Sequence, residues 1–400
     1  MTVTVVGMDG DALPSDVTER LEKATLVVGG RRHLQAHARE GATTIELGAL
    51  DAALTALASH SPDDGDAVVL ASGDPGFFGV LRALREKGIR PEVRPATSSV
   101  QRLAAMIGRP WDDMVVVSAH GRGLRQALNV CRAHPSVAVL TAPGAGPAEL
   151  GAGLHGWRRT LIVAEDLGGS EEVSTVDAAA AGSRQWRDPN VVFCLAEPDT
   201  VPDRGWLSGG EVGPDAAGWA FAEDAFAHRD GMVTKSEVRA VALAKLAPRR
   251  GSLVWDVGAG SGAVAVECAR FGAAAIAIER DPVQCVRIIA NATSYGVDVR
   301  VVEAEFLAAI SGLPQPDSIF VGGGRIQVLR ACTTVGAQRI VVALAAVDRV
   351  APARNTLREA GYQVQGVQLS ASRLEDLPDG ASRLSSINPV TLLWGVRKPS

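Results

Sequence analysis

The chain has 400 residues, which is too long for one ordinary domain and predicts two or three. It is 46% apolar and 21% charged, as is typical of a globular protein, and a net charge of −5 without a basic tract argues against a nucleic-acid partner. The five cysteines are scattered singly and no apolar run approaches the roughly 20 residues of a membrane span, so we expect a cytoplasmic protein without a metal site or a membrane partner.

The first half of the chain alternates between short apolar runs and helical patterns, as in an α/β sheet. Strands are predicted at 2–6, 25–28, 43–47, 67–70, 92–95, 114–118, 137–140, 161–163 and 191–195. Helices are predicted at 14–24, 32–40 and 50–59. The continuous apolar strands favour a parallel sheet that is buried on both faces.

Four turns of small and polar residues follow strands of this half. They are the runs 71–80, 96–101, 119–122 and 141–144. The first run contains Asp74, which is predicted to cap a helix that begins near Pro75. Because the carboxyl-end loops of an open α/β sheet line its ligand crevice, the first half is predicted to have a site of its own.

Residues 197–219 contain several prolines, glycines and aspartates without a periodic pattern, so they are the best candidate for a linker. A helix is predicted near Lys235, with an apolar stripe formed by Val238, Val241, Ala242 and Leu246. Further strands are predicted at 253–257, 274–279, 299–302, 318–321, 339–344, 362–370 and 389–396. Helices are predicted between them at 261–270, 282–294, 305–311, 325–335 and 351–360.

The run Leu253–Gly262 joins a buried strand to a helix through a glycine turn, the arrangement that holds a nucleotide-like cofactor. Glycine lets the backbone approach a ligand and adopt positive φ. One interpretation is the dinucleotide pattern G-x-G-x-x-A, with Glu279 about 20 residues later on the ribose. The other is D-x-G-x-G-x-G, from Asp256 to Gly262, the first motif of class I S-adenosylmethionine (SAM) methyltransferases.

SAM is favoured over NAD at this turn. NAD needs N–H groups for its pyrophosphate, whereas an acid beside the loop suits the ammonium group of SAM. A helix before the first strand and a pair of strands at the end also match a seven-stranded methyltransferase sheet. An NAD-dependent oxidoreductase and a non-catalytic SAM- or nucleotide-binding module remain alternatives.

Motifs in the first half resemble those of the tetrapyrrole (corrin/porphyrin) methylase family. They are the run Ser72–Gly79, the loop Val6–Asp11, the pair Ser98-Ser99 and the run His120–Arg122. Tetrapyrrole methylases bind SAM at such loops, so the resemblance implies a first SAM site here.

Motifs in the second half resemble those of the C15-methylating, decarboxylating precorrin methyltransferases. They are the run Met232–Arg239, the Asp256 run, Phe320–Gly324 and Asn388–Val390. Fused in this order, the two halves resemble the precorrin-6Y C5,15-methyltransferase (decarboxylating) family of aerobic cobalamin biosynthesis.

The resemblance implies an α/β protein with a two-subdomain tetrapyrrole methylase fold (class III) at 1–200 and a linker at 201–230. A seven-stranded, Rossmann-like class I methyltransferase domain is expected at 231–400. It also implies two SAM molecules per chain, C5 methylation in the first half, and C15 methylation with loss of the C12 acetate carboxylate in the second. The expected partner is a small-molecule tetrapyrrole, and a homo-oligomer is expected.

The motifs and the resemblance together assign SAM-binding residues in both halves. These are Gly7, Gly73, Asp74, Ser98, Ser99 and Thr141, and then Thr234, Asp256, Gly258, Ala259, Gly260, Ser261, Gly262, Glu279, Glu305 and Phe306. Substrate contacts are expected at His120, Lys235, Arg239, Gly322 and Gly323. The turn 304–307 departs from the small turn of relatives, and there we expect the edge of Phe306 to pack on the adenine. No catalytic residue is singled out, because a sulfonium leaves readily and positioning is the main requirement.

Overall fold

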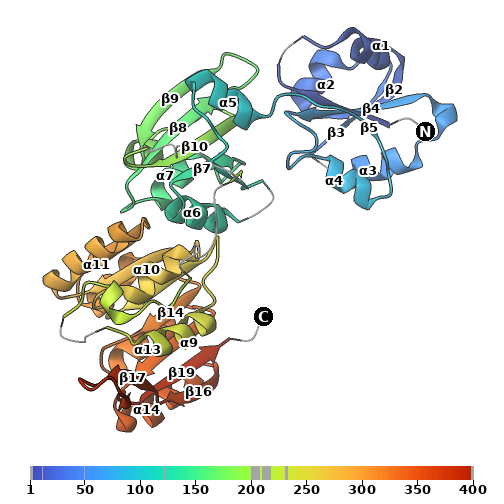
Figure 1. Cartoon of the computed structure of the whole chain (residues 1–400). Coiled ribbons are helices and arrows are strands. Elements are labelled where there is room, and N and C mark those ends of the chain that lie inside the picture. Colours follow the sequence, from blue (N-terminus) through green and yellow to red (C-terminus); the bar gives the residue numbers. More distant parts are fainter. Residues whose placement is uncertain are drawn as a thin grey trace.

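The computed structural model describes residues 3–10, 12–48, 50–120, 123–199, 208–209, 218–229 and 233–397. These residues form three large sheets with helices, and a separate two-stranded hairpin (Figure 1). Much of the predicted linker, and the motif residues Asp11, Gly121, Arg122 and Met232, lie outside the described residues. Within the described ranges, no helix is both long enough and apolar enough to cross a bilayer.

The first sheet is parallel throughout, with the strand order β3-β2-β4-β1-β5. Its strands are β1 (Val3–Met8), β2 (Ala24–Gly29), β3 (Thr43–Glu46), β4 (Asp66–Ser72) and β5 (Glu92–Arg94). Its helices are α1 (Ser15–Lys23), α2 (Arg31–His37), α3 (Leu50–Ser59), the 3-10 helix η1 (Pro62–Asp64) and α4 (Leu81–Glu86). Alternate residues of β4 pack on opposite faces, Val69 in the cluster with α3 and Val68 in the cluster with α1, as predicted for a strand buried on both faces.

The predicted helix at Pro75 is wrong, because α4 begins only at Leu81. Gly73 has a φ of +66°, and Oδ1 of Asp74 accepts a hydrogen bond from the N–H of Gly76 at 2.7 Å. A side chain that closes a turn with its own backbone competes with helix formation. Asp74 therefore closes a turn and caps no helix.

The second sheet has the strand order β6-β7-β10-β8-β9, in which β6 and β7 are parallel and the other pairs antiparallel. Its strands are β6 (Val115–Ser118), β7 (Ser136–Leu140), β8 (Arg159–Glu165), β9 (Glu172–Asp177) and β10 (Asn190–Ala196). Its helices are α5 (Ser99–Ile107), α6 (Leu124–Ala133), α7 (Pro147–Gly153) and α8 (Ala178–Ser183). The sequence did not predict β9, a mostly polar strand at the sheet edge that buries no full apolar face.

The third sheet has seven strands in the order β13-β12-β11-β14-β15-β19-β16. Its strands are β11 (Leu253–Val257), β12 (Ala274–Glu279), β13 (Val299–Glu303), β14 (Ser318–Val321), β15 (Arg339–Leu344), β16 (Gln363–Leu369) and β19 (Val390–Val396). Strand β19 pairs antiparallel with both β15 and β16, and the other pairs are parallel. Its helices are α9 (Ser236–Leu246), α10 (Ala263–Arg270), α11 (Pro282–Ser294), α12 (Phe306–Ala309), α13 (Ile326–Thr334) and α14 (Val350–Glu359), with the 3-10 helices η2 (Glu223–Ala225), η3 (Ile310–Gly312) and η4 (Val347–Arg349). Helices α9, α10 and α11 cover one face, and α12, α13 and α14 cover the other.

The hairpin of β17 (Ser372–Asp376) and β18 (Ser382–Ser386) was not predicted. Its strands are largely polar and exposed, so neither shows an alternating apolar pattern. Arg373 in β17 nevertheless ties the hairpin to α9, because its guanidinium pairs with the carboxylate of Glu237 at 2.7 Å.

Trp157, between α7 and β8, joins the second sheet to the third. Its side chain is 6% exposed and belongs to the same buried cluster as Leu253 and Trp255 of β11. The guanidinium carbons of Arg132 and Arg300 lie 4.6 and 4.8 Å from its ring centre. In Figure 1, α6 lies on the side of the second sheet that faces α10 and α11. The described part of the chain thus packs its two halves together through a buried aromatic anchor.

Trp157→Ala should destabilise this junction by about 3–5 kcal/mol, the usual cost of removing a large buried aromatic side chain. Urea unfolding followed by tryptophan fluorescence measures the loss. Trp219→Ala is the matched control. Because Trp219 is 44% exposed, its replacement should lower the free energy of unfolding clearly less. Equal losses for the two variants would contradict the anchoring role.

Candidate active sites

The ends of three neighbouring strands, β1, β4 and β5, form the candidate site of the first half. A Cβ atom on Gly7 would lie 2.7 Å from the Cβ of Ala96 and 2.7 Å from the carbonyl oxygen of Gly73, so only glycine fits where the strand ends meet. The N–H of Gly73 donates to the carbonyl of Met8 at 2.7 Å. The structure therefore brings the predicted residues Gly7 and Gly73 together.

Ser98 and Ser99 begin α5 beside the same strand ends. The Ser98 hydroxyl accepts a hydrogen bond from the N–H of Gln101 at 3.2 Å, and the Gln101 side chain accepts one from the N–H of Ser98 at 3.0 Å. A Cβ atom on Gly73 would lie 3.6 Å from the Cα of Ser98. The first turn of α5, with its unpaired N–H groups, thus borders the Gly73 turn.

Thr141 and His120 follow strands of the second sheet. The Thr141 hydroxyl donates to Oδ1 of Asn190 at 2.7 Å, so Asn190 fixes its direction. His120 is exposed, and its backbone N–H donates to the hydroxyl of Ser118 at 3.3 Å. Its ring has no hydrogen-bond partner among the described residues.

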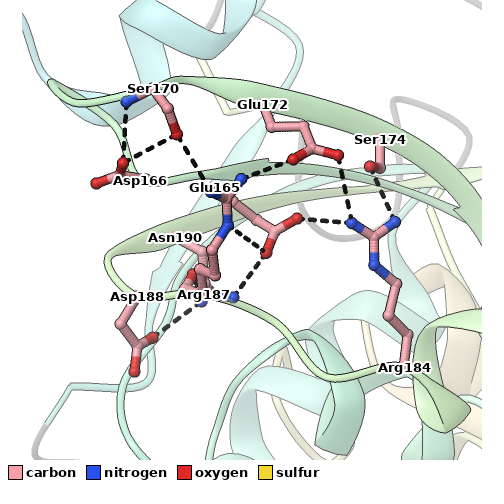
Figure 2. Close-up of polar contacts among 9 residues, drawn as sticks. All are labelled: Glu165, Asp166, Ser170, Glu172, Ser174, Arg184, Arg187, Asp188 and Asn190. Carbon is pink, nitrogen blue, oxygen red and sulfur yellow. Dashed lines mark hydrogen bonds and ion pairs between the residues drawn. The ribbon is translucent and has the colours of Figure 1, made fainter.

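A polar network behind Thr141 holds Asn190 in place (Figure 2). The amide of Asn190 donates to Asp188 at 2.9 Å. Glu165 is 2% exposed and accepts hydrogen bonds from the Arg184 guanidinium at 2.8 Å and from the Arg187 N–H at 2.6 Å. Sequence reasoning missed this network, because its members come from separate elements and carry no common spacing.

The candidate site of the second half is the glycine turn between β11 and α10. Gly258, Gly260 and Gly262 have φ values of +69°, +56° and +74°, which favour glycine. A Cβ atom on Gly258 would lie 3.2 Å from the Cα of Gly323, so the loops after β11 and β14 touch. The exposed residues here are Gly258, Gly322 and Gly323, and the half-buried ones are Ala259 and Gly260. The turn therefore exposes its backbone at the end of the sheet.

Glu279 closes the side of this turn, as its position at the end of β12 predicted. Its Oε2 accepts a hydrogen bond from the N–H of Gly260 at 2.9 Å. Its Oε1 accepts hydrogen bonds from the N–H groups of Arg280 and Asp281 at 2.9 and 3.0 Å. A carboxylate has about four acceptor sites, so Oε2 has one acceptor site left.

Asp256 is buried beneath the turn, whereas the prediction placed an open acid beside the loop for an ammonium group. The residue is 1% exposed, and its Oδ2 accepts a hydrogen bond from the N–H of Ala265 at 3.0 Å. Burial, with a smaller contribution from the charge of Glu279, raises the pKa of its carboxyl to about 8. Ser261 is also buried, at 2% exposure, and its carbonyl accepts from the Asn291 amide at 2.8 Å. Both residues therefore make buried hydrogen bonds that support the turn.

Arg239 does not bind substrate carboxylates, which corrects another prediction. Its side chain is fully buried, and its Nε donates to Glu267 at 2.6 Å. Its other nitrogens donate to the carbonyls of Thr234 and Phe221. Arg239 therefore fixes the segment that carries Thr234, while Thr234 and Lys235 themselves are half-buried before α9.

Arg373 adds a second support to this segment, which sequence reasoning also missed. Its guanidinium hydrogen-bonds to Glu223, Glu237 and Ser236. The Arg373 bonds to Glu223, opposed in part by burial, lower the pKa of Glu223 to about 2. The segment before α9 is thus held between a buried ion pair and a second cluster of charged residues.

Phe306 does not offer its edge to an adenine, contrary to prediction. The ring is 5% exposed and lies edge-on to Trp255, with 6.0 Å between ring centres. The neighbouring Glu305 is exposed and pairs with Arg280 at 2.9 Å. Leu307 is 54% exposed in the same turn. No group of three or more potential metal ligands occurs in the part of the chain that the structure describes.

Asp256→Asn should change the pH dependence of stability. The folded-state pKa is raised from 3.8 to about 8, so stability is full below the ordinary pKa and falls as pH rises towards about 8. The amide cannot ionise and escapes this loss. Scanning calorimetry should show that the stability of the variant rises relative to that of the wild-type chain between about pH 5 and about pH 8. A constant difference across this range would show that the carboxyl ionises normally.

Comparisons with known proteins agree with this two-part arrangement. Residues 3–181 match the model of tetrapyrrole (corrin/porphyrin) methylases, and residues 224–394 match that of the precorrin methyltransferase domain. The chain is 35% identical over 176 residues to a cobalt-precorrin-7 C(5)-methyltransferase of Salmonella typhimurium, covering 41% of this chain and 85% of the relative. It is 30% identical over 190 residues to a probable cobalt-precorrin-6B C(15)-methyltransferase (decarboxylating) of Pyrobaculum calidifontis, covering 44% and 97%.

A third relative spans both parts. It is a precorrin-6Y C(5,15)-methyltransferase [decarboxylating] of Sinorhizobium sp, and it is 39% identical over 335 residues. The alignment covers 81% of this chain and 78% of the relative. The chain is therefore a methyltransferase that belongs to the precorrin-6Y C5,15-methyltransferase (decarboxylating) family.

Proposed function

We propose that the chain methylates a precorrin at C5 in its first half and at C15 in its second, with loss of the C12 acetate carboxylate as carbon dioxide. We assign C5 methylation to residues 1–200, the linker to 201–230, and C15 methylation with decarboxylation to 231–400. The observation that carries this proposal is the pair of separate glycine turns, at Gly73 and at Gly258–Gly262, each at the carboxyl ends of parallel strands.

We infer that each turn binds a SAM molecule, which supplies a methyl group on a good leaving group. At the second turn, Gly258 and Gly260 leave the backbone accessible, and Glu279 keeps an acceptor for a ribose hydroxyl. At the first, Gly7 and Gly73 keep side chains away from the strand ends, and α5 directs its N-terminus there. We propose two SAM sites per chain on this basis.

The chain's own task is to position a nucleophilic meso carbon in line with the methyl group and away from water. Decarboxylation of a ring acetate needs an electron sink, which a protonated imine-type ring nitrogen would provide. His120, exposed and without a side-chain partner among the described residues, is our candidate for contact with the tetrapyrrole at the first site. Gly322 and Gly323, which touch the Gly258 turn, are candidates at the second.

Other features of the proposal extend beyond the sites. Aerobic cobalamin biosynthesis, a cytoplasmic location and a homo-oligomeric state stay predictions from the sequence. A purely NAD-dependent oxidoreductase and a non-catalytic module are less well supported, because the chain belongs to a methyltransferase family.

A pair of matched glycine variants tests the division of labour. Gly260→Val should abolish the second methyl transfer and the loss of carbon dioxide but keep the first transfer, because a β-branched residue is strained at a φ of +56°. Gly73→Val, at a φ of +66°, should do the reverse. Mass spectrometry of the tetrapyrrole product reads out each step, and calorimetry with SAM should find two sites in the wild-type chain and one in each variant.

Loss of both activities in both variants would contradict two independent sites. A wild-type chain that binds NAD, does not bind SAM and adds no methyl group would overturn the proposed function itself.

Glu279→Ala should weaken SAM binding at the second site by roughly 1–3 kcal/mol, the scale of lost hydrogen bonds to a charged group. Glu303→Ala is the matched control, because Glu303 lies opposite Glu279 in the neighbouring strand β13 and is exposed. Calorimetry with SAM in the Gly73→Val background isolates the second site. An unchanged affinity for Glu279→Ala would remove Glu279 from the ribose site.

A further inference from the structure

A cavity of about 330 Å³ lies between the two halves of the chain. The first half contributes Phe78, the end of β6 and one side of α6. The second half contributes the run 249–251, just before β11, and Asp317, just before β14. The walls therefore come from both methyltransferase units.

The cavity lining carries more positive than negative charge. Its charged side chains are Arg125, Arg249 and Arg250 against Asp317. Arg125 pairs with Asp317 at 2.9 Å, and the other oxygen of Asp317 accepts a hydrogen bond from the N–H of Leu253 at 2.8 Å. The one carboxylate that lines the cavity is thus already bound to Arg125 and to the backbone, and it does not neutralise the charges of Arg249 and Arg250.

Arg249 and Arg250 have no carboxylate partner among the described residues. Arg249 is exposed, and its guanidinium makes no hydrogen bond within the described ranges. Arg250 donates from Nε to the ring of His134 at 3.1 Å, and its Nη2 is buried without an acceptor. Burial lowers the pKa of His134 to about 4, so this partner is a neutral imidazole. A partly buried guanidinium without a counter-charge is costly, and a bound anion would remove that cost.

The first-half wall of the cavity belongs to segments of the first candidate site. Phe78 lies in the same turn as Gly73 and Asp74, is 53% exposed and has a φ of +56°. A bulky residue rarely adopts this conformation, and such strain concentrates at functional sites. Ser118, which accepts the N–H of His120, lines the cavity as well. The cavity therefore borders the first site, at the amino ends of β11 and β14 and away from the Gly258 turn.

We propose that the second half supplies Arg249 and Arg250 to the substrate site of the first half, where they bind peripheral carboxylates of the tetrapyrrole. Guanidinium groups bind carboxylates through paired hydrogen bonds, which suits this ligand. A cavity of about 330 Å³ is at the small end of ligand pockets, so it takes the carboxylate edge of the ring system and not the whole ring. The identity of the ligand rests on the proposed function, whereas the anion site rests on the cavity alone.

Contacts around the cavity hold the segment that carries these arginines against the first half. The Asn129 amide in α6 donates to the carbonyl of Gly251 at 3.1 Å. Arg159 in β8 pairs with Asp298 of the second half at 2.7 Å. The first site is thus incomplete unless the second half is docked on it.

The alkylation rate of a cysteine placed in the cavity shows whether a ligand is bound there, and it needs no enzymatic turnover. Gln126 lines the cavity and is exposed, and the five native cysteines are buried. In full-length Gln126→Cys, uroporphyrin, a tetrapyrrole with eight carboxylates, should slow alkylation by iodoacetamide by roughly tenfold, the scale of one or two charged hydrogen bonds. A tetracationic porphyrin should give no protection. Arg358→Cys, at an exposed position on α14, is the control that neither porphyrin should protect.

Adding Arg249→Gln and Arg250→Gln should abolish the protection by uroporphyrin. Arg249→Gln alone should reduce it severalfold, and this variant keeps the test valid if the double variant fails to fold, because the Arg249 side chain is exposed and makes no hydrogen bond within the described ranges. Protection that persists without both arginines, or equal protection by both porphyrins, would overturn the inference. If the wild-type chain adds no methyl group to a precorrin, the proposed function fails instead, whatever the alkylation shows.

Turnover gives an independent measure of the same coupling. The Arg249→Gln variant, altered only in the second half, should raise the KM for the tetrapyrrole in the first-half methylation severalfold and leave SAM affinity at both sites unchanged. A KM effect confined to the second-half reaction would also overturn the inference.

Discussion

The docking of Trp157 onto the third sheet is the interaction on which the two-part architecture depends. The guanidinium groups of Arg132 and Arg300, one from each half, both lie over its ring. The two like charges repel each other, but the negative potential above the aromatic ring attracts each cation and offsets part of that repulsion. Burial of the group, and the charge of Arg300, contribute to lowering the pKa of Arg132 to about 10. The anchor fixes α6, and α6 in turn forms one wall of the cavity between the halves.

Local sequence patterns predicted most of the second half. The strands of the third sheet are short apolar runs in a regular βα alternation, so β11, β12 and their helices were found with nearly the observed bounds. The glycines of the turn were also predictable, because positive φ at three alternate positions requires them. The distance of Glu279 along the chain and its place at the end of the next strand pointed to this carboxylate, and in the structure it contacts the glycine turn through the N–H of Gly260.

Two of the errors at the sites have a common cause, which is that burial depends on residues far away in sequence. Arg239 was expected at a substrate but is neutralised by Glu267, which no local pattern links to it. Phe306 was assigned to an adenine because the sequence could not show that Trp255 lies beside it. Asp256 could have been predicted as buried, since it stands in a strand whose neighbours are all apolar. The helix expected at Pro75 failed for a local reason, the side-chain turn of Asp74.

The Trp157 junction also bears on why the two activities are carried on one chain. Tethering makes docking intramolecular, so the effective concentration of one half around the other is set by the connecting segment and not by the amount of protein. An interface with one buried aromatic anchor and a few ion pairs resembles a transient contact, which two separate proteins would lose on dilution. If the two halves were separate proteins, a first site that needs arginines from the second half would work only at high concentrations of both. Covalent fusion removes that dependence on dilution.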